Sequence, residues 1–375
     1  MAEKSVPRDL FLWAHDQKDV VWMSQNTNTI PMPDHMNGAI MEAVRTREYA
    51  QYPYAPGLPG LRELLMDDLG LTGSEPPFST LLTNGAIEAL YILNRALLRP
   101  GDEVISTDPT FVPIHKQIEM NGARPVAVPV YGSTWKLTPE QINENLGPKT
   151  KMILFIDPLN PLGSGYNRDE VRAVAEIAED SKIWLVHDIT YRDFAYEHTM
   201  ASEFYPEGTL YAYSFSKNLG FAGMRIGALI APAGLMDSTL RHYDTNVLSV
   251  NILAQVGARA ALETKGEWMA DMVAVARNNQ NIIKEAVDRV PGAFIPVFPS
   301  STNMLVIDIA DTGVDPDDLQ REMLLEDHVF IRSGGYVSAA FGHRFVRVSF
   351  TVPEEGARRF ADSFVRRMGE LGDGA

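Results

Sequence analysis

Lys217 lies in the segment whose residue types and spacing are best suited to chemistry. It follows a predicted strand at 210–214, with Ser214 three residues before it and Arg225 eight residues after it. A lysine amine can form an imine with a carbonyl compound, and a serine and an arginine near it can hold an anion. The full pattern, Ser-x-x-Lys followed by Gly-x-Arg-x-Gly, is the most specific chemical signal in the chain.

Polar side chains also follow two other predicted strands. Asp188 comes directly after an apolar run, and Tyr191 follows three residues later. Asn160 comes after a buried strand predicted at 152–156. Because open α/β sheets bind ligands at the carboxyl ends of their strands, we expect these side chains to meet Lys217 at one edge of a sheet.

Further residues could bind an anion, a planar ring and a carboxylate. Gly85, Ala86 and Ile87 open a predicted helix straight after a strand, so its first N–H groups are free for a phosphate. Phe111, after another strand, offers a flat apolar cover for a ring. Arg347, within a predicted strand, offers a guanidinium fork for a carboxylate.

Together these residues supply what pyridoxal phosphate (PLP) requires of a protein. The cofactor needs a lysine for its imine and an acid that keeps the pyridine nitrogen protonated, so that the ring can accept electrons. It also needs a helix N-terminus and a cation for its phosphate. The sequence offers a candidate for each of these requirements.

The motifs, from Tyr52 to Arg347, occur in the order typical of the fold-type I aminotransferases (class I and II), and the chain resembles that family over nearly its whole length. The resemblance implies PLP as cofactor, Lys217 as its Schiff-base partner and proton shuttle, and Asp188 at the pyridinium nitrogen. It implies Arg347 and Asn160 at the substrate carboxylate. The residues that it implies for binding the cofactor are Gly85, Ala86, Ile87, Phe111, Asn160, Asp188, Tyr191, Ser214, Lys217 and Arg225, with Tyr52 acting from a second subunit.

The segment around Tyr52 is similar to the family pattern Tyr-x-Pro-x-x-Gly-x-x-x-Leu-Arg. Gly57, Leu61 and Arg62 match this pattern, whereas Tyr54 stands in place of the proline. In the family this tyrosine reaches the phosphate of the neighbouring subunit. The resemblance therefore implies a homodimer with shared active sites.

The segment 22–31 departs most from the family. It carries Ser24, Gln25, Asn26 and Asn28 where relatives have a Gly-x-Pro-like segment that closes over the substrate. We expect Asn26 and Asn28 to contact the substrate; the alternative is an ordinary turn rich in asparagine and threonine. No second arginine can be assigned to a side-chain carboxylate from the sequence, so a dicarboxylate substrate is not supported.

The predicted function is amino-group exchange between an amino acid and a 2-oxo acid. The same residues would serve a PLP-dependent C–X lyase, decarboxylase or cyclase in a biosynthetic pathway, and this alternative stays open. A PLP-binding module without catalysis is a third reading. It is disfavoured because every chemical position is occupied and no basic patch or helix-turn-helix extension is visible.

The elements that must position these residues alternate between strands and helices. From about 79 to 230, short apolar runs and helical patterns alternate, which predicts an α/β fold with a mostly parallel sheet between helices. Thr138 and Asn167 are expected to cap helices, the former with Pro at the first helical position. Two long helical stretches are predicted between 234 and 290.

The C-terminal part reads as a smaller α+β module. Strands are predicted at 303–309, 329–332 and 345–350, with a helix at 316–326 that Asp315 caps, and a final helix. We expect three divisions of the chain: an N-terminal arm and part of the small domain (1–45), a large PLP-binding domain (46–288) and a small C-terminal domain (289–375).

Composition limits the classes of function. The formal net charge is −16, which repels nucleic acid phosphates, so no nucleic acid partner is expected. The chain has no cysteine, which excludes disulfides and thiolate metal sites, and no metal site is predicted. Because it has neither a signal-like segment nor an apolar run long enough for a membrane span, we expect a cytoplasmic protein without a membrane partner.

Overall fold

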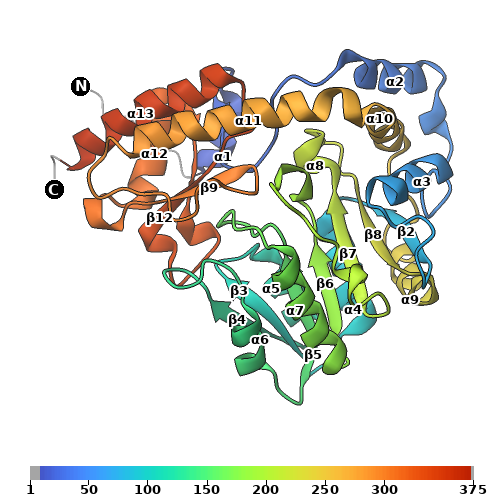
Figure 1. Cartoon of the computed structure of the whole chain (residues 1–375). Coiled ribbons are helices and arrows are strands. Elements are labelled where there is room, and N and C mark those ends of the chain that lie inside the picture. The colour runs from blue at the N-terminus through green and yellow to red at the C-terminus, as the bar shows by residue number, and fades with distance from the viewer. Residues whose placement is uncertain (1–8, 373–375) are drawn as a thin grey trace.

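The computed structural model describes residues 9–372 and is built around a seven-stranded sheet (Figure 1). The strand order is β2-β8-β7-β6-β5-β3-β4, and every neighbouring pair is parallel except those that involve β8. The strands are β2 (Phe78–Thr83), β3 (Glu103–Asp108), β4 (Arg124–Pro129), β5 (Thr150–Ile156), β6 (Trp184–Asp188), β7 (Thr209–Ser214) and β8 (Gly227–Pro232). The predicted mostly parallel sheet is confirmed. Because β8 runs against both neighbours, β2 ends at the same edge as β7.

Helices flank this sheet and join its strands. α4 packs against α5 and α9, whereas α6 packs against α7. Their bounds are α4 (Ala86–Leu97), α5 (Pro113–Met120), α6 (Pro139–Asn145), α7 (Arg168–Asp180), α8 (Phe215–Asn218) and α9 (Ala233–Asp244). Both predicted helix starts are confirmed: Thr138 forms a capping box with Gln141, and Asn167 forms one with Glu170.

The region after β8 contains three helices where two long stretches were predicted between 234 and 290. α9 ends at Asp244, α10 spans Ile252–Glu263 and α11 spans Lys265–Val287. The additional break comes from local polar groups, since the Asn251 side chain accepts a hydrogen bond from Leu253 N and so begins a new helix.

The C-terminal part forms a small antiparallel sheet of order β11-β12-β9, which confirms the predicted α+β module. The elements of this C-terminal part are β9 (Met304–Asp308), α12 (Pro316–Asp327), β10 (Val329–Phe330), β11 (Arg332–Ser333), β12 (Phe345–Ser349) and α13 (Glu354–Gly372). Asp315 caps α12 as predicted. The single strand predicted at 329–332 is wrong, because β10 pairs with an N-terminal strand while β11 pairs with β12.

The N-terminal residues contact both parts of the molecule. β1 (Val21–Trp22) is parallel to β10, and α1 (Leu10–Asp16) packs on α12. α2 (Asp34–Arg45) packs instead on α10. Residues 1–8 of the predicted arm, and 373–375 of the predicted C-terminal domain, lie outside the described residues. The domain limits remain a prediction.

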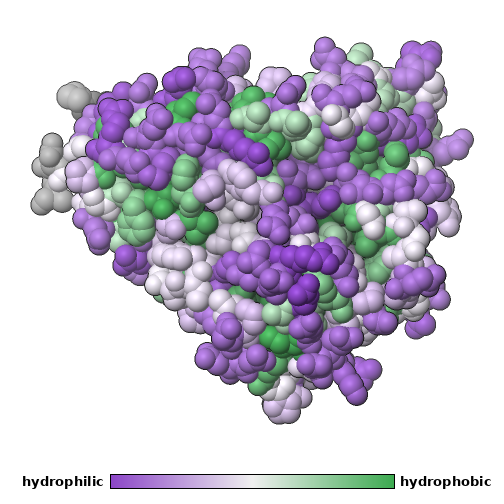
Figure 2. All heavy atoms as spheres, viewed as in Figure 1, coloured by the Kyte–Doolittle hydropathy of each residue, from purple (hydrophilic) through white to green (hydrophobic). Residues whose placement is uncertain are grey.

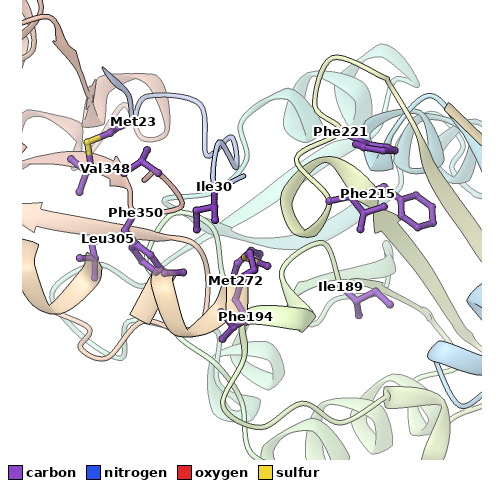
Figure 3. Close-up of a cluster of buried hydrophobic side chains, with 14 of the residues drawn as sticks. Met23, Ile30, Ile189, Phe194, Phe215, Phe221, Met272, Leu305, Val348 and Phe350 are labelled. Atoms are coloured by element: carbon purple, nitrogen blue, oxygen red, sulfur yellow. The ribbon is translucent and has the colours of Figure 1, made fainter. Parts of the chain in front are cut away.

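A cluster of buried apolar side chains joins these parts (Figure 3). It brings together side chains of the 23–30 segment, of β9 and β12, of α11 and of the segments around Asp188 and Lys217. The members labelled in Figure 3 are Met23, Ile30, Ile189, Phe194, Phe215, Phe221, Met272, Leu305, Val348 and Phe350. Because packed interiors tolerate little displacement, this cluster fixes the N-terminal segment relative to the end of β7.

A network of ion pairs anchors the turn that carries Lys217. Lys265 Nζ contacts Asp68 at 2.7 Å and Asp193 at 2.8 Å, and Arg192 contacts Asp68 at 2.8 Å. Asn218, next to Lys217, donates to Asp193. Burial alone would raise the pKa of Asp193, but Lys265 and Arg192 outweigh burial and lower it. The network ties α3 (Pro59–Asp68) and α11 to α8.

Polar residues cover most of the molecular face shown in Figure 2, with smaller apolar patches between them. Among the helices within 9–372, none combines the length and the apolar character needed to cross a membrane.

Replacing Lys265 with methionine should lower the free energy of unfolding by about 3 kcal/mol, because Asp68 and Asp193 then stay buried with Arg192 as their one remaining cation. Urea unfolding followed by circular dichroism measures the change. Arg358→Met is the matched control, since it removes only an exposed pair with Glu354 and should leave stability nearly unchanged. Equal losses in the two variants would contradict the anchoring role.

Candidate active site

A cavity of about 240 Å³ lies where β5, β6 and β7 end. The start of α4, the 24–26 segment and residues of β11 and β12 complete its wall. The cavity therefore lies at the carboxyl ends of the parallel strands, where the positions of the polar residues in the sequence predicted a binding site.

Lys217 lies in the single turn of α8, which Ser214 caps by accepting a hydrogen bond from Ser216 N at 3.1 Å. Its side chain is half-buried, and Nζ donates to Gln25 O at 3.2 Å. Burial, followed by the nearby Arg347 and Arg225, lowers the pKa of Lys217 to about 7. A lysine with this pKa is partly neutral near pH 7, so its amine can act as a nucleophile or a base.

Asp188 ends β6 and is buried at the cavity wall. Its Oδ1 accepts a hydrogen bond from Thr190 N at 3.0 Å. Burial raises the pKa of Asp188, and the hydrogen bond from Thr190 opposes this shift. A buried carboxylate at the cavity wall is suited to hold a cationic N–H of a bound ring.

Asn160, Tyr191 and Arg347 form a buried hydrogen-bonded chain. Asn160 and Asn26 each donate through Nδ2 to Tyr191 Oη at 3.3 Å. Arg347 donates through Nη1 to Asn160 Oδ1 at 3.3 Å and through Nη2 to Ser24 O at 2.8 Å. Burial raises the pKa of Tyr191 to about 12, so the phenol stays protonated.

Arg347 keeps an unused donor. Its Nε is buried without a hydrogen-bond partner in the described chain, and burial lowers the pKa of its guanidinium to about 10. An unpaired buried donor is costly, so the guanidinium is prepared to receive an anion such as a carboxylate.

The start of α4 forms an anion cradle with Arg225. The N–H groups of Ala86 and Ile87 lie in the first helical turn, without a carbonyl acceptor among the described residues. Arg225 donates to Asn84 O and Ala222 O, both at 2.9 Å, and is thereby held beside this turn. The expectation for Gly85 needs correction, because its N–H donates to Thr83 O at 2.8 Å instead of facing a ligand.

Gly85 contributes through its backbone conformation and its lack of a side chain. It has a φ of +79°, and a Cβ there would approach Arg225 Nη2 to 2.5 Å. Only glycine therefore allows the arginine to lie against the helix start.

Phe111 lines the cavity and is partly buried, which suits a ring cover. Tyr52 does not line the cavity of its own chain and is 84% exposed. Its predicted action on a neighbouring subunit stays a prediction.

Asn26 lines the cavity, as predicted, whereas Asn28 does not. The Asn28 side chain donates to Asn218 O and accepts from Ile30 N, both at 3.1 Å. The prediction that Asn28 contacts substrate is therefore corrected: it holds the loop against the Lys217 turn, because both of its polar atoms are already used.

The cavity residues that sequence reasoning missed include Ser216, Arg332 and Tyr336. Ser216 could have been found, since it lies in the first turn of the lysine motif. Arg332 could not, because only the pairing register of β11 places it opposite Arg347. Its guanidinium lies 4.0 Å from the centroid of the Tyr336 ring, and no described acid pairs with it.

The cavity therefore gathers four basic side chains and one acid. Lys217, Arg225, Arg332 and Arg347 line it, with Asp188 as the acidic group. Such a site favours ligands that carry several negative charges, one at the α4 cradle and others at the two arginines of the small sheet.

Comparisons with known proteins agree with this geometry. The model of the family "Aminotransferase class I and II" matches residues 18–364. The aspartate aminotransferase of Pyrococcus horikoshii is 26% identical over 369 residues, covering 95% of this chain and 92% of that protein. The aspartate/prephenate aminotransferase of Thermus thermophilus is 29% identical, covering 94% of this chain and 91% of that protein.

Solved structures show the same architecture. The aspartate aminotransferase from Thermus thermophilus with maleate has a TM-score of 0.82 and 26% identity, covering 95% of this chain and 94% of that one. An aminotransferase from Mycobacterium tuberculosis, at 21% identity, shares the fold with a TM-score of 0.86 over 98% of both chains. Since the family model spans most of the sequence and the fold matches along nearly its whole length, the chain belongs to the class I and II aminotransferases.

Proposed function

We propose that this aminotransferase works with PLP bound covalently through Lys217 Nζ. The observation that carries the proposal is the placement of Lys217, with its lowered pKa, and the buried carboxylate of Asp188 in one cavity. The remaining groups fit the same cofactor. Ala86, Ile87 and Arg225 would hold its phosphate, with Ser214 and Ser216 nearby. Asn160 and Tyr191 would face its ring oxygen, and Phe111 would cover the ring.

When bound, PLP would supply the electrophilic carbon of its imine for the substrate amine and a ring that accepts electrons from the Cα–H bond. The protein supplies positions and protons. Asp188 would keep a positive charge on the ring nitrogen. Lys217 Nζ, once the substrate amine has displaced it from the cofactor, would take the proton from the substrate Cα and pass it to the cofactor carbon C4′. Arg347 and Asn160 orient the substrate carboxylate, which fixes the Cα–H bond relative to Lys217.

We further propose an acidic amino acid or its oxo acid as substrate, which departs from the expectation drawn from the sequence. Arg332 and Arg347 are cross-strand partners, and like charges in such positions repel each other. Two carboxylates of one ligand would relieve this repulsion. Relatives named aspartate aminotransferases, and a relative's structure with maleate, support the same class.

A homodimer completes the proposal. Between residues 41 and 54 the chain exposes several large apolar side chains, which a second copy could cover. They are Met41, Val44, Tyr49, Tyr52 and Tyr54. Tyr52 would then reach the phosphate site of the partner, as the family resemblance implies.

Replacing Lys217 with alanine should abolish the absorbance band of the imine between the lysine and PLP. It should also lower the rate of transamination by at least about 10³-fold, because the amine both bonds the cofactor and moves the proton. Spectra of the half-reaction with aspartate and glutamate measure both effects. Lys18→Ala, at an exposed lysine, is the control. Release of ammonia without conversion to the pyridoxamine form would favour a lyase instead.

Replacing Arg332 with glutamine should lower kcat/KM for aspartate and 2-oxoglutarate about 10²-fold, since a charge-assisted pair to the distal carboxylate is lost. Activity with alanine, which lacks that carboxylate, should change little. Arg332→Lys should restore part of the loss. A uniform loss over acidic and neutral substrates would contradict the proposed contact.

The rate at which acetic anhydride labels Lys217 in the cofactor-free protein should rise up to about pH 7 and then level off. Only the neutral amine reacts, and the lowered pKa makes the amine neutral above pH 7. An ordinary lysine continues to gain reactivity up to about pH 10. Peptide mass spectrometry measures labelling, with exposed Lys18 as internal reference. Parallel curves for the two lysines would speak against a lowered pKa.

A further inference from the structure

A second polar cluster lies buried beside the active site. Asp157, His187 and His198 place one ligand atom each within 4.8 Å of one another. His187 Nε2 lies 3.5 Å from Asp157 Oδ2, and His198 Nε2 lies 3.7 Å from the same oxygen. The three residues are far apart in the sequence and show no ligand-like spacing, so only the fold brings them together.

The polar atoms of this cluster lack partners. Both carboxylate oxygens of Asp157, both ring nitrogens of His187 and Nε2 of His198 are buried without a hydrogen bond. Asp157 and His187 are fully buried, and the His198 side chain is 8% exposed. Native interiors leave few such atoms unsatisfied, and this cluster holds five of the fifteen found in the described chain. Three of these atoms, Asp157 Oδ2, His187 Nε2 and His198 Nε2, lie close to one another, so one species bound between them could satisfy all three.

The chain itself offers no cation to balance Asp157. Within 9–372, its only ion-pair contacts are those to the two histidines. The nearby Lys136 is already paired with Glu170 at 2.6 Å. An unpaired buried carboxylate is unfavourable, and a bound cation would remove that cost.

We propose that Asp157, His187 and His198 bind a divalent transition-metal ion of the zinc class. Imidazole nitrogen and carboxylate oxygen are ligands that zinc accepts. At bond lengths of 2.0–2.1 Å, tetrahedral geometry separates two ligand atoms by about 3.3–3.5 Å. The observed 3.5 and 3.7 Å are close to this separation, and they are too long for a good direct hydrogen bond.

The ion would support the active site without taking part in its chemistry. His187 directly precedes Asp188 on β6, so the two side chains point to opposite faces of the sheet. Asp157 N also donates to Asp188 O at 3.1 Å. A metal bound by Asp157, His187 and His198 would join the ends of β5 and β6 to the loop that returns through His198, and it would hold Asp188 in place.

Three measurements on the full wild-type protein test the site: zinc content by mass spectrometry after purification, calorimetric titration of the chelator-treated protein with ZnCl₂, and anomalous X-ray scattering at the zinc edge. We expect about one ion per chain, an anomalous peak between the three side chains, and a rise in Tm when zinc is added. A crystal with only a water molecule at this position, and no zinc uptake in the titration, would overturn the proposal.

Variants separate this site from metal bound elsewhere. His198→Phe keeps the ring volume and removes the ligand atoms, so its zinc content and its zinc-dependent rise in Tm should both be lost. His343→Gln, at an exposed histidine away from the cluster, should bind zinc as the wild type does. Unchanged zinc binding in folded His198→Phe would contradict the assignment. None of these readouts depends on PLP or on activity.

Discussion

Mutual repulsion of positive charges is the constraint on which this active site depends. Four basic side chains line one cavity with a single carboxylate. Those of Lys217, Arg225 and Arg347 are held mainly by backbone carbonyl oxygens, of Gln25, Asn84, Ala222 and Ser24. Backbone dipoles orient a cation without neutralising it. The acidic residues that give the chain its charge of −16 lie elsewhere, so the negative charges that this cavity needs must arrive with its ligands.

Holding like charges together requires a rigid frame, and each part of the fold contributes to it. The sheet edge fixes Asp188 and Lys217, the ion pairs of Lys265 brace the lysine turn, and the apolar cluster of Figure 3 locks the 23–30 segment against both. The proposed metal at Asp157 would add a brace on the opposite face. Preorganisation of this kind means that the protein does not have to rearrange its charges when substrate binds.

The sequence predicted those features that local patterns encode. Strand-terminal Asp188 and Asn160, the lysine motif and the capping boxes at Thr138 and Asn167 all depend on neighbours a few residues away, and the structure places them as predicted. Features that depend on distant pairing were not accessible. The register that sets Arg332 opposite Arg347 is of this kind, as are the division of 329–332 between two sheets and the meeting of Asp157 with two histidines. Asn28 was misassigned because composition does not show which way a loop side chain points.

The contact between Ser24 O and Arg347 joins residues 323 positions apart, and β1 pairs with β10 across a similar span. Contacts of such separation form late in folding, because the intervening chain must first be ordered. During synthesis the lysine turn emerges long before β12 does. The contacts of Arg347 can therefore be assembled only after most of the chain has left the ribosome. Until then the nascent chain has Lys217 without Arg332 and Arg347, so the basic wall of the cavity is completed last.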